Sequence, residues 1–344
     1  MSERAASARI AVVGSGIAGL SAAWLLSERH DVVLYEEDKR LGGHSNTVAV
    51  AVEGVPVEVD TGFIVFNEPA YPNLTAMFRH LGVATAPSDM SFAVSLDDGR
   101  LEYAGTDLRG LFAQRRNLLN PRFWGMLRDL LRFYREAPSH AGRLGLTTLG
   151  EYLAAERYGA AFRDDHLLPM AAAIWSAPAR VLLDYPAEAF IRFCENHGLL
   201  RLVGRPIWRT VEGGSRHYVE RLASNLKGMR LGCGARRIER GRFGVDILDA
   251  SGDRERFDEV VLATHADTAL SLLADPQDDE AALLSAFRYS ANRAVLHRDP
   301  ELMPKRRSVW AGASTGSRRR GGTTSRRASC RWPSRRRTGR CGTS

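Results

Sequence analysis

Residues 10–43 read IAVVGSGIAGLSAAWLLSERHDVVLYEEDKRLGG, and this stretch decides the fold of the chain. Its first four residues form an apolar run, which predicts a buried parallel strand because such strands are apolar on both faces. Glycines follow at GxGxxG spacing, and the pattern then predicts a helix over residues 18–27 and a second strand over residues 31–35. Together these elements make a β–α–β unit.

The glycine-rich turn predicts a site for a dinucleotide. Gly14 permits the tight turn, Gly16 lets a diphosphate approach the backbone, and Gly19 lets the helix pack closely on the strand. Free backbone N–H groups and the helix dipole both favour an anion there. Glu36 ends the second strand, where its carboxylate can accept hydrogen bonds from a ribose. A glycine-rich turn without a ligand is the alternative, which an acid at this distance disfavours.

Length and composition bound the remaining possibilities. A chain of 344 residues predicts about two domains, and 44% hydrophobic residues suffice for a sizeable core. The first nine residues are polar and no run of 18 apolar residues occurs, so we expect a cytoplasmic protein that does not span a membrane. The four cysteines form no CxxC pair, so we expect neither a metal site nor a disulfide framework.

The net charge of +8 comes from residues 312–344, which hold ten arginines, six glycines and no acid. Such a tail could be a nucleic-acid arm or a disordered, solvated end. A third interpretation suits it better, because arginine outnumbers lysine by 45 to 3, as in a GC-rich gene, and such DNA read out of frame encodes mainly Arg, Gly, Ser, Pro and Ala. We therefore hypothesise a frameshift near Ala311, a disordered tail over residues 312–344 and no nucleic-acid partner.

The stretch EEDKRLGG at residues 36–43 resembles the fingerprint of FAD enzymes of the flavin-containing amine oxidase and phytoene desaturase superfamily. The stretches VDTGFIVFNEPAYPNL, SDMSFAVS, LPMAAAIWSAP and RPIWRTVEGGSRHYV resemble the predicted FAD-binding oxidoreductases often encoded beside cyclopropane-fatty-acid synthases. This resemblance extends from about residue 10 to residue 310 and implies FAD as the cofactor. The residues implied to hold FAD are Gly14, Ser15, Gly16, Ile17, Ala18, Gly19, Glu36, Glu37, Gly42, Gly43, His44, Thr61, Gly62, Phe63 and Ala235.

The resemblance also implies an α/β architecture with two domains. A Rossmann-like FAD-binding domain would comprise residues 1–66 and 205–284, and a second, α+β and largely helical substrate domain would comprise residues 67–204 and 285–311. The turn at residues 61–63 would pass beside the flavin ring, and the backbone around Ala235 beside the adenine ring. We expect strands over residues 229–238, 242–249 and 257–263, for which a plain β-meander without cofactor contact is the alternative.

A long helix is predicted in the middle of the chain, beginning with Asn120 as N-cap and Pro121 at its first position. One apolar face is expected to hold Phe123, Leu127, Leu130, Leu131 and Tyr134. The flank beside it carries Arg128, Arg132 and Arg135. A solvated basic face is the plain interpretation, and a helix lying on an anionic membrane is the alternative.

Many amine oxidases place a lysine, bound through water to the flavin N5, in the segment that corresponds to residues 285–297. This chain has no lysine there, which disfavours amine oxidation. His297 is the candidate proton carrier of the segment, with Asn292 as a second candidate catalytic residue. A histidine held by ordinary backbone contacts is the alternative for His297.

The resemblance implies an FAD-dependent oxidoreductase that removes hydride from a C–H or C–N bond. The expected substrate is an acyl chain of a modified membrane lipid, with a small-molecule amine as the alternative and a peripheral membrane contact as a further expectation. The superfamily closes its flavin site with a C-terminal glycine-rich strand and helix, which this sequence does not show. A flavin-binding protein without turnover is therefore the third alternative. The oligomeric state is left open.

Overall fold

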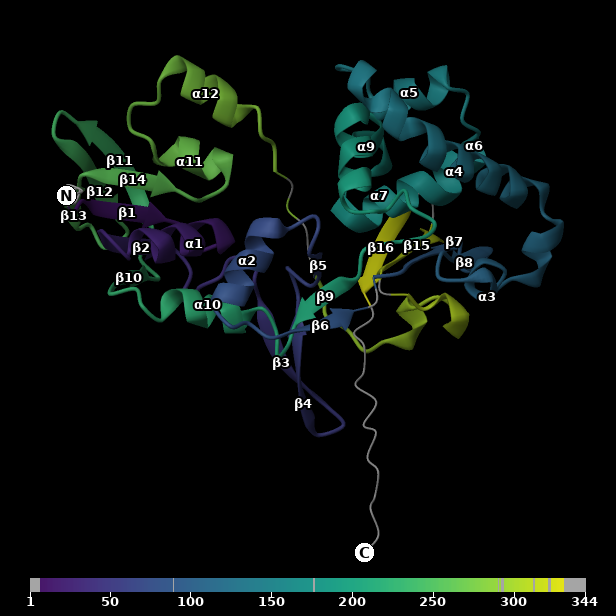
Figure 1. Ribbon diagram of the computed structural model, residues 1–344, viewed down its shortest axis with the longest axis horizontal. Coiled ribbons are helices and arrows are strands. Elements are labelled where there is room, and N and C mark those ends of the chain that lie inside the picture. Colours follow the sequence, from purple (N-terminus) through teal and green to yellow (C-terminus); the bar gives the residue numbers. More distant parts are fainter. Residues whose placement is uncertain are drawn as a thin grey trace, which may run out of the picture. The chain divides into compact units, whose positions relative to one another are not determined.

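The computed structural model describes residues 7–88, 90–175, 177–289, 291, 294–311, 313–320 and 323–330 (Figure 1). The chain forms two compact units, and each is described by itself. Unit 1 comprises Met1–Ile64, Asn73–Ala86 and Thr210–Leu296. Unit 2 comprises Val65–Pro72, Pro87–Arg209 and His297–Ser344.

A four-stranded parallel sheet is the centre of unit 1. Its order is β10 (Gly228–Leu231), β2 (Asp31–Glu36), β1 (Arg9–Val13) and β14 (Glu259–Leu262). Helix α1 (Ile17–Leu26) connects β1 to β2. The apolar run of β1 is buried along its length, as a central parallel strand requires. The β–α–β unit predicted for residues 10–43 is confirmed.

A three-stranded antiparallel sheet packs beside the parallel one and comprises β11 (Ala235–Gly241), β12 (Gly244–Asp249) and β13 (Arg254–Phe257). The core between the two sheets contains Tyr35 and Phe257, whose rings meet edge to face at 6.0 Å. Helices α11 (Ala266–Leu272) and α12 (Asp278–Ser285) follow β14.

Two of the three strands expected in this region are each divided. The predicted strand over residues 229–238 is β10 and β11, because Gly232 turns the chain with a φ of +65° and its N–H donates to the Asp38 carbonyl. The predicted strand over residues 257–263 is the end of β13 and β14, separated at Asp258, whose N–H donates to the Arg9 carbonyl at 2.8 Å. Both breaks depend on backbone partners that are remote in the sequence.

The rest of unit 1 includes the hairpin of β3 (Thr47–Val52) and β4 (Val55–Asp60) and helices α2 (Pro72–His80) and α10 (Arg216–Ala223). The hairpin turns at Glu53 and Gly54, both with positive φ. The chain passes between the units along β6 (Thr85–Ser88) and β9 (Trp208–Val211). In unit 2, β5 (Phe66–Asn67) pairs with the first half of β9.

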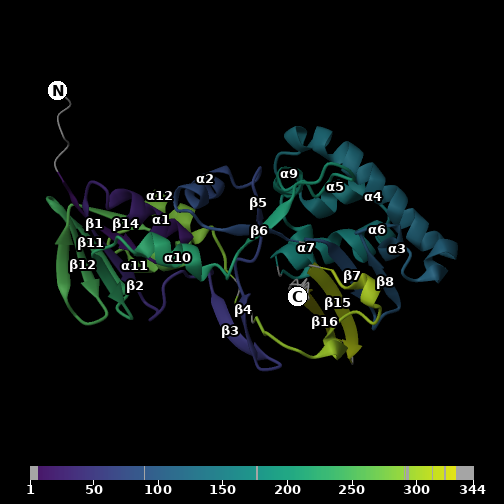
Figure 2. The ribbon, with the colours of Figure 1, turned by 60° about the horizontal axis from the view of Figure 1, so that its bottom comes forward.

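Unit 2 is largely helical, as Figures 1 and 2 show. Its longest helix, α4 (Pro121–His140), begins as predicted, with the Asn120 side chain accepting from the Arg122 N–H at 3.0 Å. Its other helices are α3 (Leu108–Leu111), α5 (Leu149–Ala155), α6 (Ala160–Phe162), α7 (Leu168–Trp175), α8 (Ala179–Leu183) and α9 (Ala187–Asn196). Short turns are η1 (Arg115–Leu119), η2 (Ala141–Arg143), the π-helical η3 (Arg163–Leu167), η4 (Pro300–Leu302) and η5 (Arg307–Val309).

The buried face of α4 differs from the predicted one. Leu131 is exposed, and Leu127 and Tyr134 are only half-buried. The buried apolar stripe is Phe123, Met126, Leu130, Phe133 and Ala137. Both stripes fit the helical repeat of 3.6 residues, but the buried face is rotated about the helix axis from the predicted one, so that Leu131 points to solvent.

A sheet of order β16-β15-β7-β8 completes unit 2, and its strands β7 (Phe92–Leu96) and β8 (Leu101–Ala104) form an antiparallel hairpin. Strand β15 (Ala313–Arg320) pairs in parallel with β7, and β16 (Thr323–Cys330) pairs with β15 (Figure 2). The expectation of disorder over residues 312–344 is therefore wrong for these two strands, since an open strand edge pairs through backbone groups whatever the sequence. The rest of the tail lies outside the described residues.

In the part of the chain that the structure describes, no helix combines the length and apolar character that crossing a membrane requires.

Candidate dinucleotide site

The first and last glycines of the β1–α1 turn have reasons within the fold. Gly14 has a φ of +100°, and a Cβ there would lie 2.8 Å from the Ala263 carbonyl oxygen. A Cβ on Gly19 would lie 1.8 Å from the Gly14 carbonyl oxygen, so α1 can approach β1 only without a side chain. These two glycines make the tight turn and the close packing that the sequence predicted.

Gly16 is different. Its φ of −62° and ψ of 178° suit any residue, and a Cβ there would meet no atom of the described chain within 4 Å. It is the N-cap of α1 and has no side chain with which to cap the helix. Ile17 and Ala18, the first helical residues, are exposed. The fold itself therefore does not require a glycine at this position. The missing side chain leaves space in front of the helix N-terminus.

The glycine pair at residues 42 and 43 closes on this turn. The Gly42 N–H donates to the Ser15 carbonyl at 3.0 Å and to Ser15 Oγ at 3.2 Å. A Cβ on Gly43 would lie 3.1 Å from Gly16 Cα, and its φ is +54°. The second glycine segment therefore forms one wall beside the exposed start of α1.

Glu36 links the turn to the end of β2. Its Oε2 accepts from the Ser15 N–H at 2.8 Å and from Ser15 Oγ, and its Oε1 accepts from the Asp38 N–H at 2.9 Å. A carboxylate offers about four acceptor positions, so about one stays open to a further donor. Glu36 thus also stabilises the loop itself, a role that the sequence did not indicate.

The segment after β10 lies against the end of β2. The Cys233 N–H donates to the Glu36 carbonyl at 3.1 Å, and a Cβ on Gly234 would lie 2.9 Å from Glu37 Cβ. The exposed Glu37 side chain forms an ion pair with Arg236 at 3.6 Å. Ala235, which is buried, begins β11 directly beside this contact. The remote part of the predicted site therefore meets the first part here.

The turn at residues 61–63 packs on His44. The Phe63 N–H donates to the His44 carbonyl at 2.9 Å, and a Cβ on Gly62 would lie 2.1 Å from that oxygen. The Thr61 N–H donates to the Asn46 carbonyl at 2.9 Å. Backbone hydrogen bonds and close approaches therefore connect these loops to one another, beginning at the carboxyl ends of β1 and β2. That edge is where parallel sheets bind ligands.

Buried polar residues that the sequence did not single out hold these loops in place. Asp60 accepts from the Ser215 N–H at 2.9 Å and from Thr47 Oγ1 at 2.6 Å, which joins the hairpin to the start of α10. Tyr218 on α10 makes a hydrogen bond with Ser45, two residues after the glycine pair. Burial raises the pKa of Tyr218 to about 12, so this hydroxyl is neutral at physiological pH.

A stack of three rings borders the same edge and was also missed. The rings of His44 and His265 lie 5.8 Å apart, and those of His265 and Tyr289 lie 4.3 Å apart and nearly parallel. The Tyr289 hydroxyl accepts from the Ala266 N–H at 3.1 Å. The only sequence signal was that His265 follows a predicted strand at its carboxyl end.

Residues 17–341 match the family described as flavin-containing amine oxidoreductase. The chain belongs to this family. The prediction of FAD as the cofactor agrees with it, and the glycine turn, the open start of α1 and the walls around it fit a dinucleotide.

Proteins that are similar to this chain carry names of different activities. A carotenoid phi-ring synthase from Streptomyces griseus is 37% identical over 107 residues, which are 30% of this chain and 19% of that protein. A triple mutant of putrescine oxidase has a TM-score of 0.61 at 18% identity, over 81% of this chain and 63% of that chain. A fatty acid isomerase from P. acnes has a TM-score of 0.52 at 21% identity over the same shares. The chain thus spans 63% of the putrescine oxidase length, and these structural likenesses show the fold alone.

The two candidate catalytic residues are His297 and Asn292. His297 is exposed and belongs to unit 2. Asn292 lies outside the described residues. A catalytic role for either residue stays a prediction.

Proposed function

We propose that unit 1 is a Rossmann-like FAD-binding domain and that the chain is an FAD-dependent oxidoreductase. The observation that carries this proposal is Gly16, a glycine without a conformational or packing reason at the open N-terminus of a ten-residue helix. Helix N-termini bind phosphate groups because their free N–H groups and dipole favour an anion. Membership of a flavin-dependent family supports FAD as the dinucleotide.

Each part of the site would then hold one part of FAD. Residues 14–19, Gly42 and Gly43 would hold the diphosphate, with the His44 imidazole beside it. Glu36 would accept from the adenosine ribose, and Glu37 and Ala235 would lie along the adenine. Residues 61–63 would border the flavin ring. Bound FAD supplies a hydride acceptor, while the protein orients the substrate and excludes water.

For the substrate, we propose an acyl chain of a modified membrane lipid, taken up by unit 2 and dehydrogenated. The resemblance to oxidoreductases encoded beside cyclopropane-fatty-acid synthases supports this choice, as do relatives named for a fatty acid and a carotenoid. An amine is the second candidate, favoured by the likeness to putrescine oxidase and opposed by the missing lysine. His297 and Asn292 are the residues that we propose for proton transfer. A cytoplasmic location suits such a substrate at the inner face of a membrane.

Anaerobic titration of the flavin-loaded protein tests this choice. Vesicles that contain cyclopropane phospholipids, vesicles of unmodified phospholipid, and putrescine are added in separate experiments. Loss of the oxidised flavin absorption with lipid alone supports the proposal. Loss with putrescine alone makes the protein an amine oxidase, and a bound flavin that none of them reduces makes it a flavin-binding protein without turnover on these compounds.

A further inference from the structure

We propose that residues 115–124 of unit 2, called here the docking segment, bind the phosphate group of an anionic lipid at a membrane surface. The segment comprises η1, Asn120 and the first turn of α4. It combines a basic pocket with exposed leucine and tryptophan side chains, which is the composition of an interfacial membrane site.

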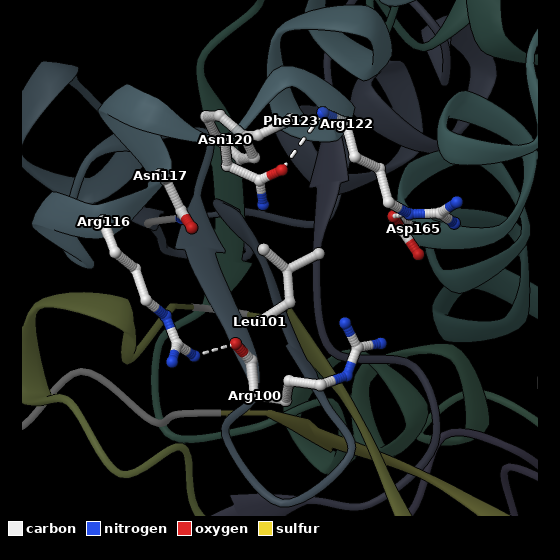
Figure 3. Close-up of a pocket in the computed structure, with 8 residues that line it drawn as sticks. All are labelled: Arg100, Leu101, Arg116, Asn117, Asn120, Arg122, Phe123 and Asp165. Atoms are coloured by element: carbon white, nitrogen blue, oxygen red, sulfur yellow. Dashed lines mark hydrogen bonds and ion pairs between the residues drawn. The ribbon is translucent and has the colours of Figure 1, made fainter.

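A pocket of about 140 Å³ opens at the docking segment (Figure 3). About 10–15 Å³ of such volume holds one water molecule, so the pocket has room for a tetrahedral oxyanion. Three guanidinium groups, two amides and one carboxylate supply its polar atoms: Arg100, Arg116, Arg122, Asn117, Asn120 and Asp165. Arginine forks match phosphate oxygens in geometry and charge.

The charge of the pocket stays positive after its own ion pairs are counted. Arg122 pairs with Asp165 at 2.7 Å, and Arg100 pairs with Asp97 at 2.7 Å. Arg116 donates instead to the carbonyl oxygen of Arg100, which holds its guanidinium at the pocket without neutralising it (Figure 3). The N-terminus of α4, a helix of 20 residues, adds its dipole at Asn120. An anion is the complementary ligand.

Apolar side chains beside the pocket point to a lipid rather than to free phosphate. Leu119 is 90% exposed, and Leu118 and Trp124 are each 49% exposed. The Trp124 indole N–H donates to the Leu118 carbonyl at 2.8 Å, so its polar atom is satisfied locally and its ring is presented to the surroundings. Trp at the headgroup level and Leu below it are typical of proteins that lie on membranes. A soluble phosphate would need neither.

The basic residues further along α4 have partners within the fold. Arg132 donates to the Glu156 carbonyl at 2.9 Å, and its guanidinium lies 3.9 Å from the centre of the Tyr158 ring. Arg128 pairs with Asp129 at 3.2 Å. We place the membrane contact at the N-terminal end of α4, because basic groups and exposed apolar side chains lie together there.

Co-sedimentation of the full chain with vesicles tests the inference. Vesicles that contain phosphatidylglycerol are compared with vesicles of phosphatidylcholine alone, at low and high salt. The variants are Arg116→Gln and Leu119→Ser. The matched controls are Arg135→Gln, whose side chain on α4 is 76% exposed, and Leu146→Ser, whose side chain is 93% exposed elsewhere in unit 2.

We expect the parent protein to bind the vesicles that contain phosphatidylglycerol and not those of phosphatidylcholine alone, and high salt should weaken this binding. Arg116→Gln should weaken it about fivefold and Leu119→Ser about tenfold or more, while both controls bind as the parent does. Equal binding to both vesicle types, or equal losses in variants and controls, would overturn the inference. Competition by inorganic phosphate without an effect of Leu119→Ser would also overturn it and indicate a free-phosphate site. The result is independent of FAD binding, which the same variants should retain.

Discussion

Replacing Gly16 by alanine should weaken FAD binding without unfolding the protein. The backbone at Gly16 suits alanine, and the added Cβ would meet no atom of the described chain within 4 Å. Alanine makes the unfolded chain less flexible than glycine does, which stabilises the folded variant by about 0.4–1 kcal/mol. Alanine is also a poorer N-cap than glycine, which destabilises the variant by about as much. The free energy of unfolding should therefore change by less than about 1 kcal/mol.

The effect on FAD is expected to be larger. The new methyl group would occupy the space through which a diphosphate reaches the N–H groups of α1. Losing one or two charge-assisted hydrogen bonds costs about 3 kcal/mol, which corresponds to a dissociation constant about a hundredfold larger. Quenching of flavin fluorescence measures the affinity, and thermal unfolding followed by circular dichroism measures stability.

Two further glycines serve as controls. Gly125→Ala also adds a Cβ that meets no described atom within 4 Å, but at the fifth residue of α4, so it should stabilise the helix by about 1 kcal/mol and leave FAD affinity unchanged. Gly19→Ala places a Cβ 1.8 Å from the Gly14 carbonyl oxygen and should lower the melting temperature. Parent-like FAD affinity in Gly16→Ala would refute the reasoning, as would destabilisation equal to that of Gly19→Ala.

Three other predictions follow from the structure. Glu36→Gln should weaken FAD binding about tenfold, because a charged acceptor is lost, whereas the exposed Glu28→Gln should not; equal affinities would reject the ribose assignment. Burial lowers the pKa of His166 from 6.5 to about 4, so the unfolded chain binds more protons between these values and the free energy of unfolding should fall by about 3 kcal/mol as pH drops through this window. Urea unfolding measures this slope, and a His166→Phe variant with the same slope would contradict its cause. A chain that ends at Ala311 lacks β15 and β16, so the free edge of β7 should lower solubility in a turbidity assay; unchanged solubility would count against that pairing.

The sequence predicted what depends on neighbours in the chain. The β–α–β unit and the N-terminal cap of α4 arise from short patterns, and both are present in the structure. The break at Gly232 could not be predicted, because its N–H is bound by the Asp38 carbonyl, far away in the sequence. The ring stack of His44, His265 and Tyr289 is of the same kind, since it needs the folded sheet to bring its members together.

The prediction of disorder at residues 313–320 and 323–330 was wrong for a different reason. Its composition predicted disorder, but strand pairing at an open edge uses backbone groups that every residue except proline supplies. The frameshift near Ala311 stays a hypothesis, and resequencing of the gene tests it.

The most direct test of the central claim is the flavin content of the purified chain. The protein is incubated with FAD, freed of excess by gel filtration, and its absorption spectrum is compared with its protein concentration, while circular dichroism reports that it is folded. Unit 1 as described predicts one FAD for each chain, and about a hundredfold weaker retention in Gly16→Ala. A folded chain that retains no flavin would contradict the account.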